Sequence, residues 1–137
     1  MRLAAADKLD DKALAQEVYA HVAKNTRRVA IEKLTDQTAL TDVALNAKYG
    51  DVRLAAADRL DDKALAQTVY ADIAQQDEDP DVRKAAVERL TDHALLTDIA
   101  RNAVHTNVRF AAVDKLGDKA LEQEIYADLA KKQGRLA

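Results

Sequence analysis

Small and apolar residues recur along this chain with the spacing of α-helices. Short segments with a narrow apolar face, such as VRLAAADRL at residues 52–60, alternate with longer segments that have apolar residues at every fourth position, as at Leu65, Val69 and Ile73. Both patterns predict helices that bury one side. Polar connections, such as residues 77–81 with their single proline, end one helix and begin the next.

The pattern predicts five antiparallel pairs of helices joined by tight turns. Each longer helix is preceded by an aspartate, whose carboxylate can accept hydrogen bonds from the free N–H groups of the first turn. These capping aspartates are Asp11, Asp36, Asp62, Asp92 and Asp118. The ten expected helices span residues 1–9, 11–24, 27–34, 36–48, 52–60, 62–76, 82–90, 92–104, 108–116 and 118–132.

The five pairs are copies of one unit. The sequence RLAAADKLDDKALAQ at residues 2–16 returns at residues 53–67 with one change, Lys8 to Arg59. A shared leucine recurs at steps of 25, 26, 30 and 26 residues, at Leu9, Leu34, Leu60, Leu90 and Leu116. This period is typical of solenoids, in which neighbouring pairs stack because no pair can bury its apolar face alone. We expect one domain, 1–137, with units at 1–25, 26–50, 51–80, 81–106 and 107–137.

Composition agrees with an all-α fold. Of the 137 residues, 48% are hydrophobic and 33% charged, a balance that is typical of folded proteins. Three glycines and one proline leave few positions for hairpin turns, and strong helix formers dominate the chain. Because only 4% of the residues are aromatic, the core must be filled mainly by closely packed Ala, Leu, Val and Ile.

Charge and targeting signals narrow the function classes. The 21 basic and 24 acidic residues are interspersed, which argues against nucleic acid as a partner. The absence of cysteine excludes disulfides, zinc–thiolate sites and cysteine nucleophiles, and fits a reducing compartment. The first residues, MRLAAADKLDD, contain no long apolar run, so neither a signal peptide nor a membrane span is expected. We therefore predict a cytoplasmic protein.

One segment carries a likeness to a known family. The sequence DPDVRKAAVERL, residues 79–90, resembles the DPxVRxAAxxxL core of HEAT repeats, especially the short bacterial HEAT-like form, and residues 51–53 and 107–109 repeat its centre. Armadillo-like solenoids are a near neighbour of this family. The resemblance covers essentially the whole chain and implies a right-handed superhelix of five HEAT-like helical pairs. It also implies a general scaffold that binds proteins, although some members of the family act on nucleic acid or pigments.

The arginine that recurs near the start of each short helix has two interpretations. Guanidinium groups at a regular spacing could hold phosphates or carboxylates. The favoured alternative is an internal ladder in which each arginine bonds a capping aspartate or the free carbonyl groups of a neighbouring repeat, as the HEAT resemblance also implies. The ladder arginines are Arg2, Arg27, Arg53, Arg83 and Arg109.

The position after this arginine is the sharpest candidate for recognition. The repeat constrains most of its residues, yet this position varies in size, charge and aromaticity, as an outward residue on a scaffold would. The competing interpretation is simple packing of the two leucines at the rim. The candidate partner-binding residues are Leu3, Arg28, Leu54, Lys84 and Phe110.

Two other repeated features favour structural roles. Tyr19, Tyr70 and Tyr126 occupy one repeat position, and we expect them to be packed between repeats with the hydroxyl at the rim rather than to form a row for binding. Each short helix also carries an acidic residue followed by a basic one. We expect these pairs to be solvated. They are Asp7-Lys8, Glu32-Lys33, Asp58-Arg59, Glu88-Arg89 and Asp114-Lys115.

The residue types and their spacing give little support for a catalytic function. His21, His93 and His105 lie in different copies at different repeat positions, and none has the spacing of a metal-ligand motif. The chain contains no serine and no glycine-rich phosphate loop. We therefore predict a non-catalytic scaffold without a cofactor or metal that presents repeated surface residues to a protein partner. A nucleic-acid-binding solenoid and an accessory or lyase-like HEAT protein are the alternatives.

Overall fold

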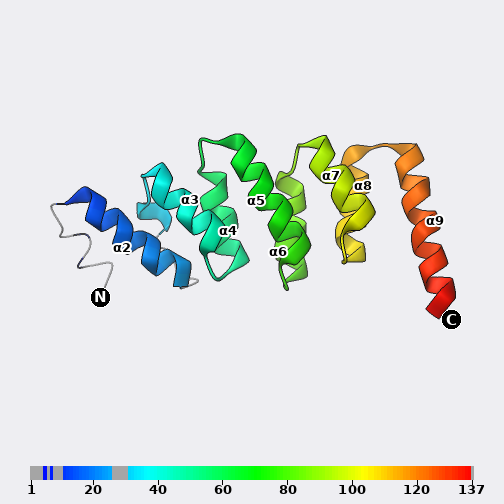
Figure 1. Ribbon diagram of the computed structural model, residues 1–137, viewed down its shortest axis with the longest axis horizontal. Coiled ribbons are helices and arrows are strands. Elements are labelled where there is room, and N and C mark those ends of the chain that lie inside the picture. The colour runs from blue at the N-terminus through cyan, green and yellow to red at the C-terminus, as the bar shows by residue number, and fades with distance from the viewer. Residues whose placement is uncertain (1–4, 6, 8–10, 26–30, 137) are drawn as a thin grey trace. The chain divides into compact units, whose positions relative to one another are not determined.

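The protein is entirely helical within the part of the chain that the structure describes. The computed structural model describes residues 5, 7, 11–25 and 31–136, with side chains up to residue 132, and these residues contain no β-strand (Figure 1). The elements are α2 (Lys12–Asn25), the 3₁₀ helix η1 (Ile31–Lys33), α3 (Gln37–Asn46), α4 (Gly50–Asp58), α5 (Lys63–Gln76), α6 (Pro80–Arg89), α7 (His93–Asn102), α8 (Thr106–Leu116) and α9 (Lys119–Leu136).

Within the described residues, eight of the ten expected helices are present as α-helices, and each begins within two residues of its expected start. The helix expected over residues 1–9 and the first half of that expected over residues 27–34 lie largely outside the described residues. The described part of the second, Ile31–Lys33, is a 3₁₀ helix rather than an α-helix. The all-α class is therefore confirmed for the described residues, whereas the set of ten helices stays a prediction.

Aspartate side chains set the starts of the longer helices. Asp36 Oδ1 accepts a hydrogen bond from Thr38 N at 2.8 Å, and Asp92 Oδ1 accepts one from Leu95 N at 3.1 Å. These bonds satisfy N–H groups that have no partner inside the first helical turn. The equivalent bonds at the other three longer helices come from Asp11, Asp62 and Asp118.

The short helices end in two different ways. At Leu90, the amide donates to the carbonyl of Val87 at 3.0 Å and the backbone turns to an extended conformation, which places the leucine fully in the core. The last short helix instead continues to Leu116 and ends at Gly117, whose φ of 64° lies in the left-handed region that glycine adopts without strain. Leu116 is only half-buried as a result of this longer helix.

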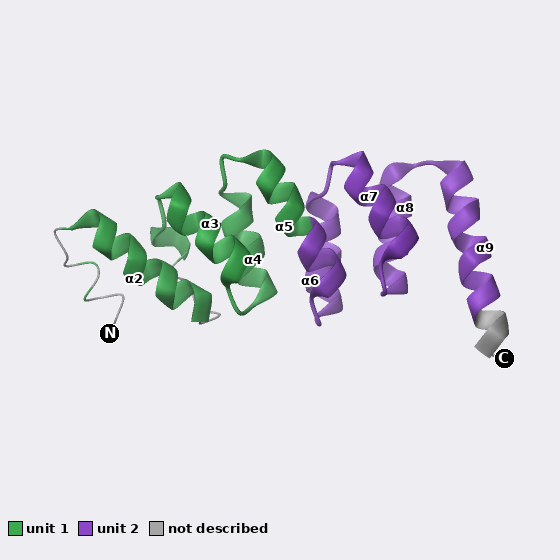
Figure 2. Ribbon diagram, in the orientation of Figure 1, with its two compact units in different colours: residues 1–70 green, residues 71–137 purple. Residues whose placement is uncertain are grey.

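The chain forms two compact units, residues 1–70 and 71–137, and the boundary falls inside α5 (Figure 2). In the first unit, α2 packs on η1 and α3, and α3 packs on α4. In the second unit, α8 packs on α6, α7 and α9. Packing of consecutive helices is compatible with a stack of helical pairs; the right-handed superhelix and the single domain stay predictions.

Small residues allow the helices of each unit to approach closely. In α3, Val43 and Ala44 are fully buried, and in α7 the equivalent Ile99 and Ala100 are fully buried as well. Close packing of this kind lets many weak contacts add up in a core with few aromatic side chains. No helix among the described residues is both long and apolar enough to cross a membrane.

Candidate functional site

Two of the repeated arginines close the carboxyl ends of longer helices. Arg53 Nε donates to the carbonyl oxygen of Ala44 at 2.8 Å, and Arg109 Nε donates to that of Ala100 at 2.8 Å. Both carbonyls lie in the last turn of a helix, where main-chain acceptors lack intrahelical partners. Each arginine therefore ties a short helix to the end of the longer helix before it.

Arg83 also donates to main-chain carbonyl groups, but through Nη1 rather than Nε. Because α5 continues to Gln76, Arg83 Nη1 donates to the carbonyl oxygens of Asp77 at 2.7 Å and Glu78 at 3.0 Å, just beyond the helix end. Its Nε, by contrast, is buried without a hydrogen-bond partner. The longer third step of the repeat, 30 residues, thus changes the bonding of the arginine that follows it. Arg2 and Arg27 lie outside the described residues.

Arg109 also forms an ion pair with the last helix. Its Nη2 donates to Asp128 Oδ2 at 3.0 Å, while the arginine side chain is 4% exposed and that of Asp128 is 45% exposed. The hydrogen bond from Arg109, followed by that from Lys132, lowers the pKa of the Asp128 carboxyl below its ordinary value. This use of the guanidinium leaves it buried in the structure rather than open to an external anion.

In two of the acidic–basic pairs of the short helices, the basic residue makes a hydrogen bond to a neighbouring short helix. Lys115 Nζ donates to the carbonyl oxygen of Glu88 at 2.6 Å, at the end of the neighbouring short helix α6. Arg59 donates from Nη1 to the carbonyl of Ile31 in η1. Both bases are exposed, as expected for solvated pairs, and each in addition bonds a neighbouring short helix. The signal that could have found them is the constant basic residue one position before the core leucine.

Two of the repeated tyrosines are buried and bonded to the acidic residue of these pairs. The hydroxyl groups of Tyr19 and Tyr70 donate to Asp7 Oδ1 and Asp58 Oδ1, each at 2.5 Å, and both tyrosines are less than 8% exposed. The bond to Asp7 raises the pKa of Tyr19 and lowers that of Asp7. The expectation of packed tyrosines is confirmed at these two positions. Tyr126, the third, is 39% exposed.

The described residues at the candidate recognition position are buried in the first unit and exposed in the second. Leu54 is 5% exposed, so the expectation of an outward side chain is wrong there. It packs, as the alternative interpretation proposed, but in the core rather than at the rim. The physical reason is that α4 packs against both α3 and η1, which leaves little of its surface open. In the second unit, Lys84 and Phe110 are exposed. Leu3 and Arg28 lie outside the described residues.

Lys84 and Phe110 occupy the same repeat position on two helices that pack on each other, α6 and α8. Each follows a buried arginine that fixes its helix, Arg83 or Arg109. The ring of Phe110 contacts Tyr126 of α9 edge to face, with centroids 5.4 Å apart and planes at 62°. A cation and two partly exposed aromatic rings thus stand on one set of packed helices, which we call the α6–α8 surface.

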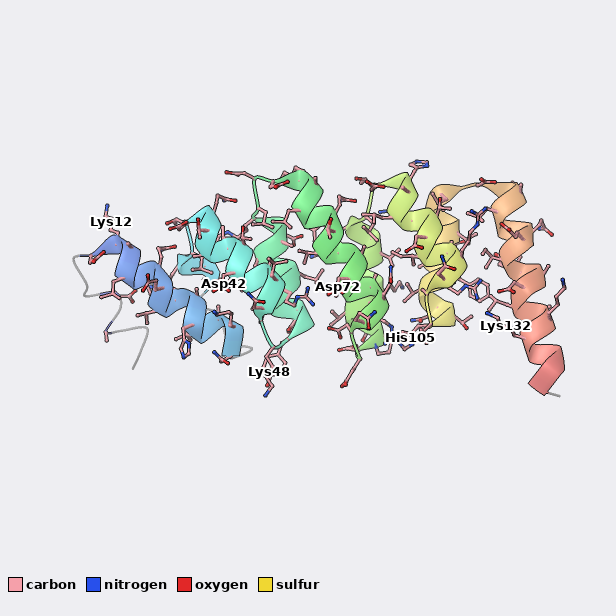
Figure 3. All side chains as sticks on the ribbon, viewed as in Figure 1. Lys12, Asp42, Lys48, Asp72, His105 and Lys132 are labelled. Atoms are coloured by element: carbon pink, nitrogen blue, oxygen red, sulfur yellow. The ribbon has the colours of Figure 1, made fainter. Side chains whose placement is uncertain are left out.

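The first unit contains a groove between α2 and α3. It has a volume of about 520 Å³ and is lined by Gln16, Glu17 and His21 of α2, with Asp42 among the residues of α3. Lys24 Nζ crosses the groove to Asp42 Oδ2 at 2.7 Å; Asp42 is labelled on α3 in Figure 3. Charges in the groove are therefore partly neutralised by the protein itself.

The Lys24–Asp42 pair predicts a pH dependence. The hydrogen bond from Lys24, more than that from Asn46, lowers the pKa of Asp42 from its ordinary value of 3.8. Because the folded pKa is the lower one, the stabilisation is present above pH 3.8 and is lost as the pH falls through the folded pKa. In carboxyl NMR titrations, Lys24→Met is expected to move the Asp42 midpoint upward, whereas the exposed-site control Lys12→Met leaves it unchanged. An unchanged midpoint in Lys24→Met would contradict the pairing.

The three histidines do not form a common site. His93 begins α7, His105 precedes α8, and His21 lines the groove on α2. Among the described residues, no group of three or more His, Cys, Asp or Glu side chains is arranged to hold a metal ion.

Comparison with protein-family models, with curated proteins and with solved structures found no match to this chain.

Proposed function

We propose that the protein is a non-catalytic scaffold that binds a protein partner through the α6–α8 surface. The observation that carries the proposal is the exposure of Lys84 and Phe110 at one repeat position of two packed helices, each next to a buried arginine. Rigid helices hold these side chains in place, so little conformational freedom is lost when a partner binds. The HEAT-like resemblance of the repeat supports the same class of function.

The chemistry of the surface favours a particular kind of partner. Aromatic side chains supply large contact areas at interfaces, and Phe110 with Tyr126 provides such an area, while the exposed Lys84 stands on α6, which packs on the helix of Phe110. A partner segment with an apolar side chain next to a carboxylate would fit both features. Within this proposal, the buried arginines and capping aspartates support the surface and do not contact the partner.

Capture from a cell extract tests the proposal. We expect the immobilised protein to retain a discrete protein that the double variant Lys84→Glu/Phe110→Ala fails to retain, because both contacts of the α6–α8 surface are removed. The control variant Val104→Ala changes a side chain that is 87% exposed in the α7–α8 connection and is expected to retain the same protein. Retention by the double variant, or retention of nucleic acid alone, would contradict the proposal.

A further inference from the structure

The two walls of the groove between α2 and α3 are tied together at both ends by side-chain bonds. Near the start of α3, Gln16 Oε1 accepts a hydrogen bond from the amide of Asp36 at 3.1 Å. Toward the end of α3, Lys24 Nζ pairs with Asp42 Oδ2 at 2.7 Å. All four of these residues line the groove. Its walls are therefore held at a set separation within the first unit.

Between these two ties, small side chains line the groove beside a carboxylate that has no partner. Ala20 of α2 is buried and Ala39 of α3 is half-buried, and both belong to the lining. Glu17 and His21 of α2 line the same stretch and are exposed. Within the part of the chain that the structure describes, neither side chain makes a hydrogen bond or an ion pair. The volume of about 520 Å³ is thus open to a ligand that brings a donor for Glu17.

The charge of the lining favours a cationic ligand. The groove is lined by three carboxylates, those of Glu17, Asp36 and Asp42, and by the ammonium group of Lys24. Lys24 already neutralises Asp42, and Asp36 accepts a hydrogen bond from the first turn of α3. Glu17 is therefore the carboxylate that is left for a positively charged group from outside.

The second unit shows what occupies the equivalent place between two of its longer helices. Arg101 of α7 and Ala20 of α2 hold the same repeat position, nine residues after the capping aspartate. Arg101 Nη2 donates to Glu124 Oε2 of α9 at 3.3 Å, and Glu124 holds the position of Asp42, six residues after its own capping aspartate. A guanidinium group of the protein thus reaches from α7 to α9, at a position where α2 has only a methyl group.

We infer that the α2–α3 groove binds an arginine side chain of a partner polypeptide. In this contact, the guanidinium group donates two parallel hydrogen bonds to the carboxylate of Glu17, and the aliphatic part of the arginine lies over Ala20 and Ala39. Arginine fits better than lysine because its planar group matches both oxygens of a carboxylate. This inference goes beyond the proposed binding through the α6–α8 surface, which belongs to the other unit, and does not depend on it.

Titration of the full ¹⁵N-labelled chain with N-acetyl-arginine methylamide, followed by amide NMR, tests the site. We expect saturable shifts at Glu17, Ala20 and Ala39, with a dissociation constant on the order of 1 mM at low salt, where screening is weakest. Glu17→Gln keeps the shape of the side chain but removes its charge, and should raise the dissociation constant about tenfold. The matched control Glu32→Gln removes an exposed carboxylate of η1 and should leave it unchanged.

A variant that fills the groove tests its geometry. Ala20→Arg places in α2 the arginine that α7 has at this repeat position, so its own guanidinium group takes the place of the ligand. We expect this variant to lose binding of the arginine probe while circular dichroism shows the helix content of the wild type. The comparison of Glu17→Gln with Glu32→Gln decides the question whether or not Ala20→Arg folds.

The lysine probe and the contrary outcomes are specific. N-acetyl-lysine methylamide has the same charge without the planar group and should bind at least about threefold more weakly. Shifts that do not saturate up to about 20 mM arginine probe, equal affinity of Glu17→Gln and the wild type, or equal affinity for the two probes would overturn the inference. Lys84→Glu/Phe110→Ala should bind the arginine probe as the wild type does, so failure of this site and failure of the α6–α8 surface can be told apart.

Discussion

Replacing Leu90 by alanine is expected to lower the free energy of unfolding by about 2–5 kcal/mol. Leu90 is fully buried, and its main chain leaves α6 there in an extended conformation, so a smaller side chain leaves a cavity that neighbouring helices can fill only in part. Urea denaturation followed by circular dichroism measures the loss. We expect a transition at lower urea concentration with an unchanged slope.

The chain supplies a matched control for this change at the same repeat position. Leu116 belongs to the longer helix α8, which ends at Gly117, and its side chain is only half-buried. Leu116→Ala should therefore cost about half as much or less, because less surface and a smaller cavity are involved. Equal losses in the two variants would contradict the account of how the short helices end.

Replacing Arg109 by methionine is expected to lower the free energy of unfolding by about 2–4 kcal/mol. The change leaves the carbonyl of Ala100 without this donor and removes one of the two partners of Asp128, the other being Lys132. The Asp128 contribution is present above the ordinary carboxyl pKa of 3.8 and disappears as the pH falls through the lowered folded value. The difference between variant and wild type should therefore shrink in acid.

An exposed arginine provides the control for this second change. Arg101 forms an ion pair with Glu124 at 3.3 Å, in which both side chains are more than half exposed. Arg101→Met should change the free energy of unfolding by less than about 1 kcal/mol, because exposed pairs contribute little. If Arg109→Met were as mild as Arg101→Met, the repeated arginine would not be a structural tie.

The helices could be predicted from the sequence because their signals are local. An aspartate before an apolar period marks a helix start through hydrogen bonds to residues two or three positions away, as Asp36 does for Thr38. The spacing of small and branched residues likewise defines the buried side without knowledge of the neighbours. These features allowed each described α-helix to be placed within two residues of its start.

The candidate site was less predictable because exposure depends on tertiary packing. Leu54 and Phe110 hold the same repeat position, yet α4 packs in a way that covers the first, while the second remains open beside α9. The hydrogen bond from Tyr19 to Asp7 joins residues 12 positions apart on different segments, which no single-helix pattern specifies.

The central claim is that the shared residues of the repeat hold the fold and that the varying residues after the arginine bind a partner. The direct measurement compares Lys84→Glu/Phe110→Ala with the wild type in two assays, urea denaturation and binding to the captured partner. The account predicts a change in the free energy of unfolding of about 1 kcal/mol or less together with loss of binding. Unchanged partner affinity in a variant that remains folded would contradict it.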